Sequence, residues 1–299
     1  MQDLVKKKKY NWTYFYLALP FMLIIILFRY IPLFGWVLSL YEYQPGTPLM
    51  ENPFVGLKYF KMLAASRDFF RTFKNTVIFS VLGYVLLPLP MIFAILLNEV
   101  TGSRARKLFQ TLTTLPHFIS WVIVYSLAFA LFSSEGVVNT VANRIGLPTQ
   151  RLITNADAVY WFQTVILQWK TLGWSAIIYI AAIAGIDQEL YEAATVDGAG
   201  RLRCAWHITL PSLIPTFIVL ALLAVANFVN TGLDQYFVFR NPFVYDNIEV
   251  LELYTYRVGL ELFDYSYATA VGIFKSVISV VLLFTTNWIA KKARGTSII

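Results

Sequence analysis

The hydrophobic pattern of the chain consists of six long apolar runs separated by shorter, more polar segments. The runs cover Tyr14–Leu40, Thr76–Val100, Leu108–Phe132, Tyr160–Ile186, Leu213–Phe237 and Tyr267–Ala290. Each is long enough for a helix to cross the hydrocarbon core of a bilayer, which takes about 20 apolar residues. The pattern therefore predicts an all-α membrane protein with six transmembrane helices. The longest polar stretch, residues 41–75, has room only for a short surface helix around Phe54–Met62.

Prolines fall inside two of these runs, Pro88 and Pro90 in the second and Pro116 in the third. A proline removes a backbone donor and its ring clashes with the preceding turn. We therefore expect a kink or a local break in both helices, which a membrane protein tolerates where neighbouring helices or a cavity satisfy the freed carbonyls.

The composition supports a membrane class. The 299 residues are 58% hydrophobic and 14% charged, whereas soluble domains carry about 25% charged residues. The first run superficially resembles a signal peptide after the basic start MQDLVKKKKY. It is longer than such peptides, contains Arg29 and Pro32, and lacks an A-x-A cleavage pattern, so we interpret it as a retained span. The single cysteine, Cys204, excludes an internal disulfide.

The distribution of Lys and Arg predicts the orientation. With the N-terminus in the cytoplasm, the short cytoplasmic segments hold 12 basic residues, and the longer external segments hold 9. Basic residues are retained on the cytoplasmic side, so both termini are expected there. The net charge of +7 is then explained by these loops, and no nucleic-acid partner is expected.

A polar segment between the fourth and fifth runs, Glu192–Pro211, reads EAATVDGAGRLRCAWHITLP; it is called the EAA segment below. The residues before and into it, DQELYEAA, favour a helix, and Gly198 and Gly200 supply a bend. A second short helix can follow over Arg201–Thr209, before Pro211 opens the fifth span. The pattern predicts two short helices that project from the membrane at an angle.

The spacing EAA-x3-G-x9-I-x-LP resembles the EAA loop of permease subunits of ABC importers. In that family the loop is a coupling helix that inserts into a cleft of the ATPase subunit. The resemblance implies an ATPase-coupling set of Glu192, Ala193, Ala194, Asp197, Gly198, Ile208, Leu210 and Pro211. Within this set Glu192 would contact the ATPase, the two alanines would allow close docking, Gly198 would form the turn, and the last three residues would anchor the segment to the bundle.

Three further segments, YIPLFGWVLSLYEYQP, LPHFISWVI and YTYRVGLELFDYSYATAVGIFKSVIS, look like the carbohydrate branch, which takes up oligosaccharides from degraded polysaccharides. The resemblance implies a multi-pass protein of the bacterial cell membrane with a second homologous permease, two ATPase subunits that bind ATP and Mg²⁺, and an extracytoplasmic solute-binding protein as partners. It implies a cytoplasmic tail at 1–12, a first helix and external loop at 13–71, a type I permease domain at 72–290 and a second tail at 291–299.

The polar residues inside the spans are candidates for the substrate pathway, because such groups are costly in lipid and usually face a cavity or a partner. In the fifth span Asn227, Asn230, Thr231 and Asp234 would share one helical face. Lys170 and Trp174 in the fourth span and Lys275 in the sixth are the other candidates. The alternative is a role between helices, in which Asp234 pairs with Lys170 or Lys275.

Three alternative functions differ from this one in the sequence features that each would show. A permease for a non-sugar solute would carry the same EAA segment. An ion-coupled secondary transporter would show inverted repeats with broken helices at matched positions. A membrane enzyme lacks a plausible catalytic set, since the chain has two histidines, one cysteine, and neither a G-x4-G-K-[ST] nor an H-E-x-x-H pattern. We expect no catalytic residue, metal or cofactor in this chain.

Overall fold

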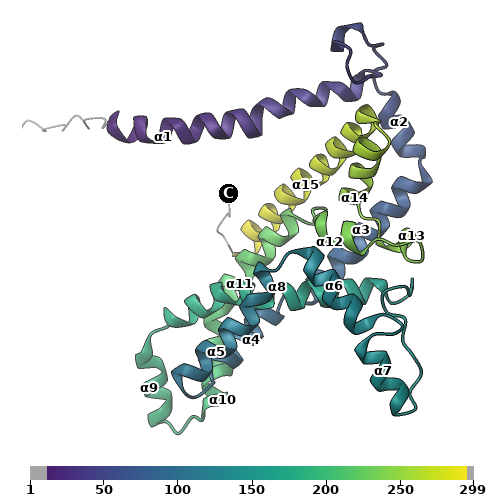
Figure 1. The fold of residues 1–299 in the computed structure, drawn as a ribbon. Coiled ribbons are helices and arrows are strands. Elements are labelled where there is room, and N and C mark those ends of the chain that lie inside the picture. Colours follow the sequence, from purple (N-terminus) through teal and green to yellow (C-terminus); the bar gives the residue numbers. More distant parts are fainter. Residues whose placement is uncertain (1–11, 295–299) are drawn as a thin grey trace, which may run out of the picture. The chain divides into compact units, whose positions relative to one another are not determined.

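The structure is a computed structural model that describes residues 12–294, and these fold into helices with one isolated antiparallel bridge, Tyr41 to Phe54, and no strand (Figure 1). The chain divides into two compact units. The first contains the chain up to Ala65 together with Arg257–Ile273, and the second contains Ser66–Tyr256 and the chain from Phe274 onward. Of the two predicted tails, 1–12 and 291–299, residues 1–11 and 295–299 lie outside the described residues, whereas Trp12 and residues 291–294 lie in helices.

The first unit begins with the first apolar run. Its elements are α1 (Trp12–Ile25), the π turn η1 (Ile26–Tyr30), the 3-10 helices η2 (Ile31–Leu40) and η3 (Leu49–Glu51), α2 (Lys58–Ala65), the π turn η6 (Arg257–Glu261) and the first turns of α15 (Tyr265–Arg294). The Ser266 hydroxyl donates to the Tyr41 carbonyl at 2.7 Å and accepts from the Tyr43 N–H at 3.1 Å. These bonds fix the segment after η2 to the start of α15. The expected surface helix is present as α2, four residues later than predicted.

The second unit is built around α8 (Val159–Ala184), which packs against α3, α4, α5 and α11. The elements around it are α3 (Arg67–Val85), α4 (Leu89–Asn98), α5 (Ser103–Thr114), the 3-10 turn η4 (Leu115–Phe118), α6 (Trp121–Phe132), α7 (Val137–Arg144), α9 (Gln188–Val196), α10 (Arg201–Cys204), the π turn η5 (Ala205–Thr209), α11 (Leu210–Ala226), α12 (Asp234–Phe239), α13 (Tyr245–Ile248), α14 (Leu251–Tyr256) and the rest of α15.

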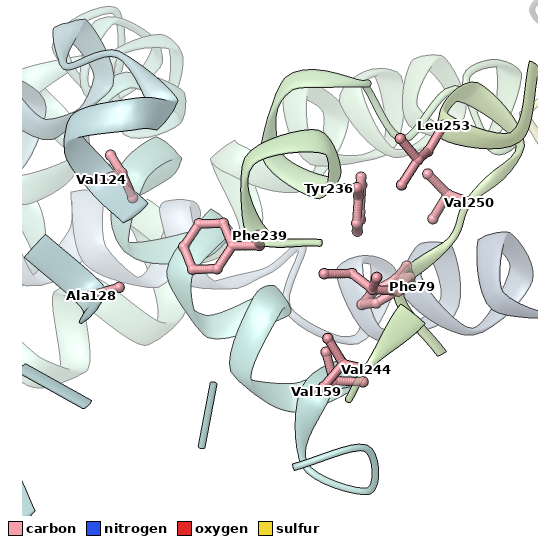
Figure 2. Close-up of a cluster of buried hydrophobic side chains, with 10 residues drawn as sticks. Phe79, Val124, Ala128, Val159, Tyr236, Phe239, Val244, Val250 and Leu253 are labelled. Carbon is pink, nitrogen blue, oxygen red and sulfur yellow. The ribbon is translucent and has the colours of Figure 1, made fainter. Parts of the chain in front are cut away.

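A cluster of buried side chains joins α3, α6, α8 and α12 in this unit (Figure 2). Tyr236 and Phe239 extend from the short helix α12 into the cluster, and the Phe79 ring lies 4.9 Å from the Tyr236 ring. Two turns of helix have little stability of their own. Burial of these two aromatic residues, both at most 2% exposed, holds α12 in place.

The six predicted spans are confirmed as helical stretches of sufficient length and apolarity. They are Tyr14–Leu40, Arg67–Asn98, Trp121–Arg144, Val159–Ala184, Arg201–Ala226 and Tyr265–Trp288. The first has the predicted limits, and the fourth agrees within two residues. The predicted proline break in the second span is present, because α3 ends at Val85 and α4 begins at Leu89.

The break expected at Pro116 in the third span is also present, but the predicted limits of that span, Leu108–Phe132, are wrong. The chain leaves the helix in the 3-10 turn η4 at Pro116 and becomes extended at Ile119 and Ser120. The Ser120 hydroxyl then caps α6 by accepting from the Ile123 N–H at 3.4 Å. The apolar helical stretch consequently runs from Trp121 to Arg144.

The predicted fifth span, Leu213–Phe237, is wrong at both ends. The helical run begins at Arg201, because α10, η5 and α11 follow one another without interruption. The short helix predicted over Arg201–Thr209 is therefore the start of this span and no separate element. At the other end α11 stops at Ala226, and Gly232 has φ +86°, a left-handed conformation that no helix continues.

Candidate functional site

The EAA segment follows α8 as a helix with caps at both ends. The Asp187 side chain accepts from the Glu189 N–H at 3.0 Å and caps α9. At its C-terminus the Ala199 N–H donates to the Ala194 carbonyl at 2.8 Å, and the Gly198 N–H donates to the Thr195 carbonyl at 3.0 Å. This pair of bonds is a Schellman motif. Gly198 has φ +76° and open space around it, so the backbone conformation alone explains the glycine.

The exposed side of the segment carries both charge and apolar surface. Glu192 and Ala193 are exposed, and so are the apolar residues Leu190, Val196 and Leu202, with Val196 88% accessible. In Figure 1, α9 and α10 lie together at one end of the second unit. The segment thus combines an exposed carboxylate with individually exposed apolar side chains.

Two contacts fasten the segment to the bundle, and sequence reasoning missed both. The Tyr191 and Thr209 hydroxyls are 2.8 Å apart, and Thr209 is buried. The Arg201 Nε lies 3.0 Å from a Glu99 carboxylate oxygen, at the end of α4. Because Arg201 and Glu99 are 102 residues apart in sequence, no local pattern could have indicated this ion pair.

The predicted anchor residues behave differently from one another. Leu210 packs against a buried cluster that contains Ala176, Tyr179 and Leu213, whereas Pro211 is exposed. Pro211 has no N–H, and the turn before it is widened, so that the Leu210 N–H donates to the Ala205 carbonyl five residues back. Pro211 thus sets the helix geometry, and Leu210 provides packing.

Three of the predicted pathway residues, Lys170, Thr231 and Asp234, line one pocket of about 680 Å³. Thr231 and Asp234 lie in or beside the irregular segment Asn227–Leu233, so the predicted polar stripe on a helical face does not exist. The Asn227 amide donates to the Leu223 carbonyl at 3.1 Å as it ends α11, and Asn230 is 3.5 Å from the Asn227 amide oxygen. Neither asparagine is among the lining residues.

Lys170 holds the break in the third span. Its ammonium donates to the carbonyls of Pro116, His117 and Ile119 at 3.0, 2.7 and 2.6 Å. The break at η4 makes these carbonyls available, and of the three the Pro116 carbonyl also accepts from the Ile119 N–H at 3.2 Å. At Gly173, three residues on, an added Cβ would lie 2.3 Å from the Thr113 carbonyl oxygen, which shows how closely α8 approaches the end of α5.

Lys275 is paired as well, but neither lysine pairs with Asp234. The Lys275 ammonium lies 3.0 Å from one oxygen of Glu252, and the Thr231 hydroxyl donates to the other at 3.0 Å. The suggested pairing of Asp234 with Lys170 or Lys275 is therefore wrong. Glu252 connects the irregular segment to α15, and the sequence reasoning had not singled it out.

Trp174 faces a different cavity. Its ring stacks on the His117 imidazole, with centroids 4.5 Å apart and planes 1° from parallel. It lines a pocket of about 410 Å³ together with Gly83 and Pro90 at the break between α3 and α4. Within residues 12–294 no group of three or more His, Cys, Asp or Glu side chains is arranged to hold a metal ion.

Comparison with known proteins agrees with this architecture. Residues 86–295 match the family model described as "Binding-protein-dependent transport system inner membrane component". The chain is 39% identical to the polygalacturonan/rhamnogalacturonan transport system permease protein YteP of Bacillus subtilis, over 93% of this chain and 88% of that protein. It is 32% identical to the arabinooligosaccharides transport system permease protein AraP of Halalkalibacterium halodurans, over 89% and 84% of the two chains.

A solved structure shares the fold over the whole chain. It is a chain of a bacterial alginate ABC transporter in complex with an alginate pentasaccharide-bound periplasmic protein, with a TM-score of 0.87 and 33% identity over 99% of this chain and 100% of that chain. The protein belongs to the family of binding-protein-dependent transport system inner membrane components and is a multi-pass protein of the bacterial inner membrane.

Proposed function

We propose that this chain is a permease subunit of an ATP-driven importer of oligosaccharides. The observation that carries the proposal is the match over 99% of this chain to a chain of a bacterial alginate ABC transporter. The relatives named above transport polygalacturonan, rhamnogalacturonan and arabinooligosaccharides, all of them saccharides. The same relatives favour a sugar over another solute, and the family match favours ATP-driven import over ion-coupled transport.

The chain works with partners in this proposal. A second homologous permease completes the pathway, an extracytoplasmic binding protein delivers the sugar, and two ATPase subunits bind ATP and Mg²⁺ beneath the EAA segment. The complex of the alginate ABC transporter with a periplasmic protein that carries an alginate pentasaccharide supports the second of these partners. Both termini and the EAA segment lie on the cytoplasmic side, and the external loops meet the binding protein.

The EAA segment transmits the motion of the ATPases to the spans. Glu192 and the exposed apolar residues Val196 and Leu202 dock into the ATPase surface. Because α10 continues through η5 into α11, a displacement of the segment reaches the fifth span without a flexible linker. The Arg201–Glu99 ion pair carries the same displacement to α4. Closure of the ATPases around ATP opens the pathway outward, and hydrolysis returns it to the inward-facing state.

The test is a charge reversal at the docking surface. In the assembled transporter Glu192→Lys should abolish co-purification of the ATPase subunits and reduce sugar uptake at least about tenfold, with normal membrane insertion. Asp157→Lys, the same change at an exposed site away from the segment, is the control and should leave co-purification of the ATPase subunits unchanged. Unchanged uptake in the Glu192→Lys transporter would refute the coupling role.

A further inference from the structure

The charge balance of the 680 Å³ pocket bears on which sugars it accepts. The pocket is lined by two charged side chains, Lys170 and Asp234. The Lys170 ammonium has three protons, and three carbonyls of the broken span take them at 3.0 Å or less. Lys170 is also only 7% exposed. It therefore has no donor left for a bidentate or direct bond to a sugar carboxylate.

The Asp234 carboxylate, in contrast to the Lys170 ammonium, is free to bind a ligand. Asp234 stands at the start of α12, is exposed, and its carboxylate has no hydrogen bond or ion pair with any of the residues that the structure describes. A free carboxylate accepts hydrogen bonds from hydroxyl groups and repels another carboxylate at short range.

A second free acceptor lies beside it. Gln235 also lines the pocket and is 3% exposed; its amide nitrogen donates to Gln163 at 2.8 Å. Its amide oxygen is buried and has no partner among the described residues. A buried acceptor left unpaired is costly, and a hydroxyl donor would satisfy it. The rings of Trp121 and Phe237 add faces on which a sugar ring can stack.

We propose that this pocket binds uncharged sugar residues through their hydroxyl groups and discriminates against uronates. The inference rests on the proposed function as a sugar permease and narrows its substrate. The pocket presents the free carboxylate of Asp234 and is lined by Gln235, whose amide oxygen is unpaired, while Lys170 is committed to the backbone. The relatives include transporters of both kinds of saccharide, so similarity alone does not decide between them.

The charge of the pocket can be measured with a thiol reporter in the complete transporter. Val122 lines the pocket and is 61% exposed, so Val122→Cys places a thiol there. This thiol should react at least about threefold faster with the cationic trimethylammonium methanethiosulfonate than with the anionic sulfonate reagent. Each rate is first divided by the rate at which the same reagent reacts with a free thiol in solution. Transporter without the reporter, in which Cys204 is the only thiol of this chain, corrects for background.

Asp234→Asn should abolish this preference at the reporter. As the matched control, Val137→Cys lies in α7 outside the pocket, and its ratio of rates should not respond to Asp234→Asn. Equal rates for the two reagents, a faster anionic reagent, or a reporter that neither reagent reaches would overturn the proposal.

The sugar class is tested by protection of the same reporter. Maltotetraose at millimolar concentration, added without binding protein, should slow labelling at least about twofold, and tetragalacturonate should not. Asp234→Asn should let tetragalacturonate protect. Protection by the uronate in the unmodified pocket, or by neither sugar, would refute the assignment of the pocket. Saccharide uptake by the complete, unmodified importer is measured in parallel. Only the absence of that uptake would count against the proposed function itself.

Discussion

Lys170 and Lys275 both lie deep within spans of this protein, and each is compensated in a different way. Lys170 in α8 is surrounded by backbone carbonyls at the break in the third span. Lys275 in α15 faces the carboxylate of Glu252, which also holds Thr231. An uncompensated charge in a membrane interior is costly, so both arrangements stabilise their surroundings.

The difference lies in what each lysine fastens. Lys170 satisfies carbonyls of η4 and so fixes the break between α5 and α6. Lys275 acts through Glu252 on the irregular segment between α11 and α12. One lysine therefore stabilises each of these two interruptions between helices. The partner of Lys275 is the Glu252 side chain, which a substitution can remove, whereas the backbone partners of Lys170 cannot be removed in this way. Four predictions test this difference.

The largest effect is expected from a side chain added at Gly173, where α8 approaches the end of α5 closely. The hydrogen bonds of Lys170 depend on this close approach. Gly173→Val would place a Cβ 2.3 Å from the Thr113 carbonyl oxygen and force α8 away from α5. Separation of the two helices would also withdraw Lys170 from its carbonyls. We expect loss of monodisperse protein in detergent, measured by size-exclusion chromatography. Gly83→Ala, with nothing within 4 Å of the added carbon, should behave as wild type; if both variants were well folded, the close approach would be wrong.

Removing one partner of the Lys275–Glu252 pair should have the next largest effect. Lys275→Met leaves the Glu252 carboxylate, whose side chain is 14% exposed, without its cation. Breaking a fully buried pair costs about 3 kcal/mol or more; this pair is partly buried, so a smaller loss is expected, seen as a lower Tm. The double variant Lys275→Met/Glu252→Gln should recover part of the loss in a double-mutant cycle. Additive effects of the two substitutions would show that the two groups do not interact.

Lys170→Met should lower the stability less than Lys275→Met does, and a second substitution at Asp234 should not restore it. It leaves carbonyl oxygens unpaired, at a cost of about 1–3 kcal/mol, but creates no opposite charge. A lower Tm is expected, and a second substitution at Asp234, such as Asp234→Asn, should restore none of it. Recovery of stability in the double variant would mean that Asp234 is coupled to Lys170 after all.

The smallest effect should come from the single hydroxyl that connects Thr231 to Glu252. Thr231→Val keeps the shape and removes one hydrogen bond to a charged group, so the loss in unfolding free energy should be about 1.5 kcal/mol. Thr231→Ser keeps the hydroxyl and should retain most of the stability, as measured by thermal unfolding. A Thr231→Ser variant as unstable as Thr231→Val would assign the effect to packing.

Local rules made one part of the site predictable. The turn at Gly198 was correctly expected, because a Schellman motif is built from bonds within six residues and needs a left-handed residue at one position. The spans were found because their apolar length depends on composition alone. The docking of the EAA segment on an ATPase, and the substrate role of Asn227 and Asn230, stay predictions.

The interior was predictable only where local signals existed. The end of α11 could have been inferred, since Asn230-Thr231-Gly232 is a turn-forming sequence, but the apolar run around it favoured a continuous helix. The partners of Lys170 lie more than 50 residues away in sequence. They accept bonds only because another helix has broken, and no pattern within α8 carries that information.

The widened turn before Pro211 also has a counterpart at the beginning of the chain. There the Ile31 N–H donates to the Ile26 carbonyl five residues back, immediately before Pro32. Such a turn holds one residue more than an ordinary α-helical turn. Deleting that residue would rotate everything preceding it by about 100° around the helix axis and shift it by about 1.5 Å. At Ala205–Thr209 the direction in which the EAA segment points from α11 is consequently set by the number of residues in the turn, so the deletion of a single codon would change it.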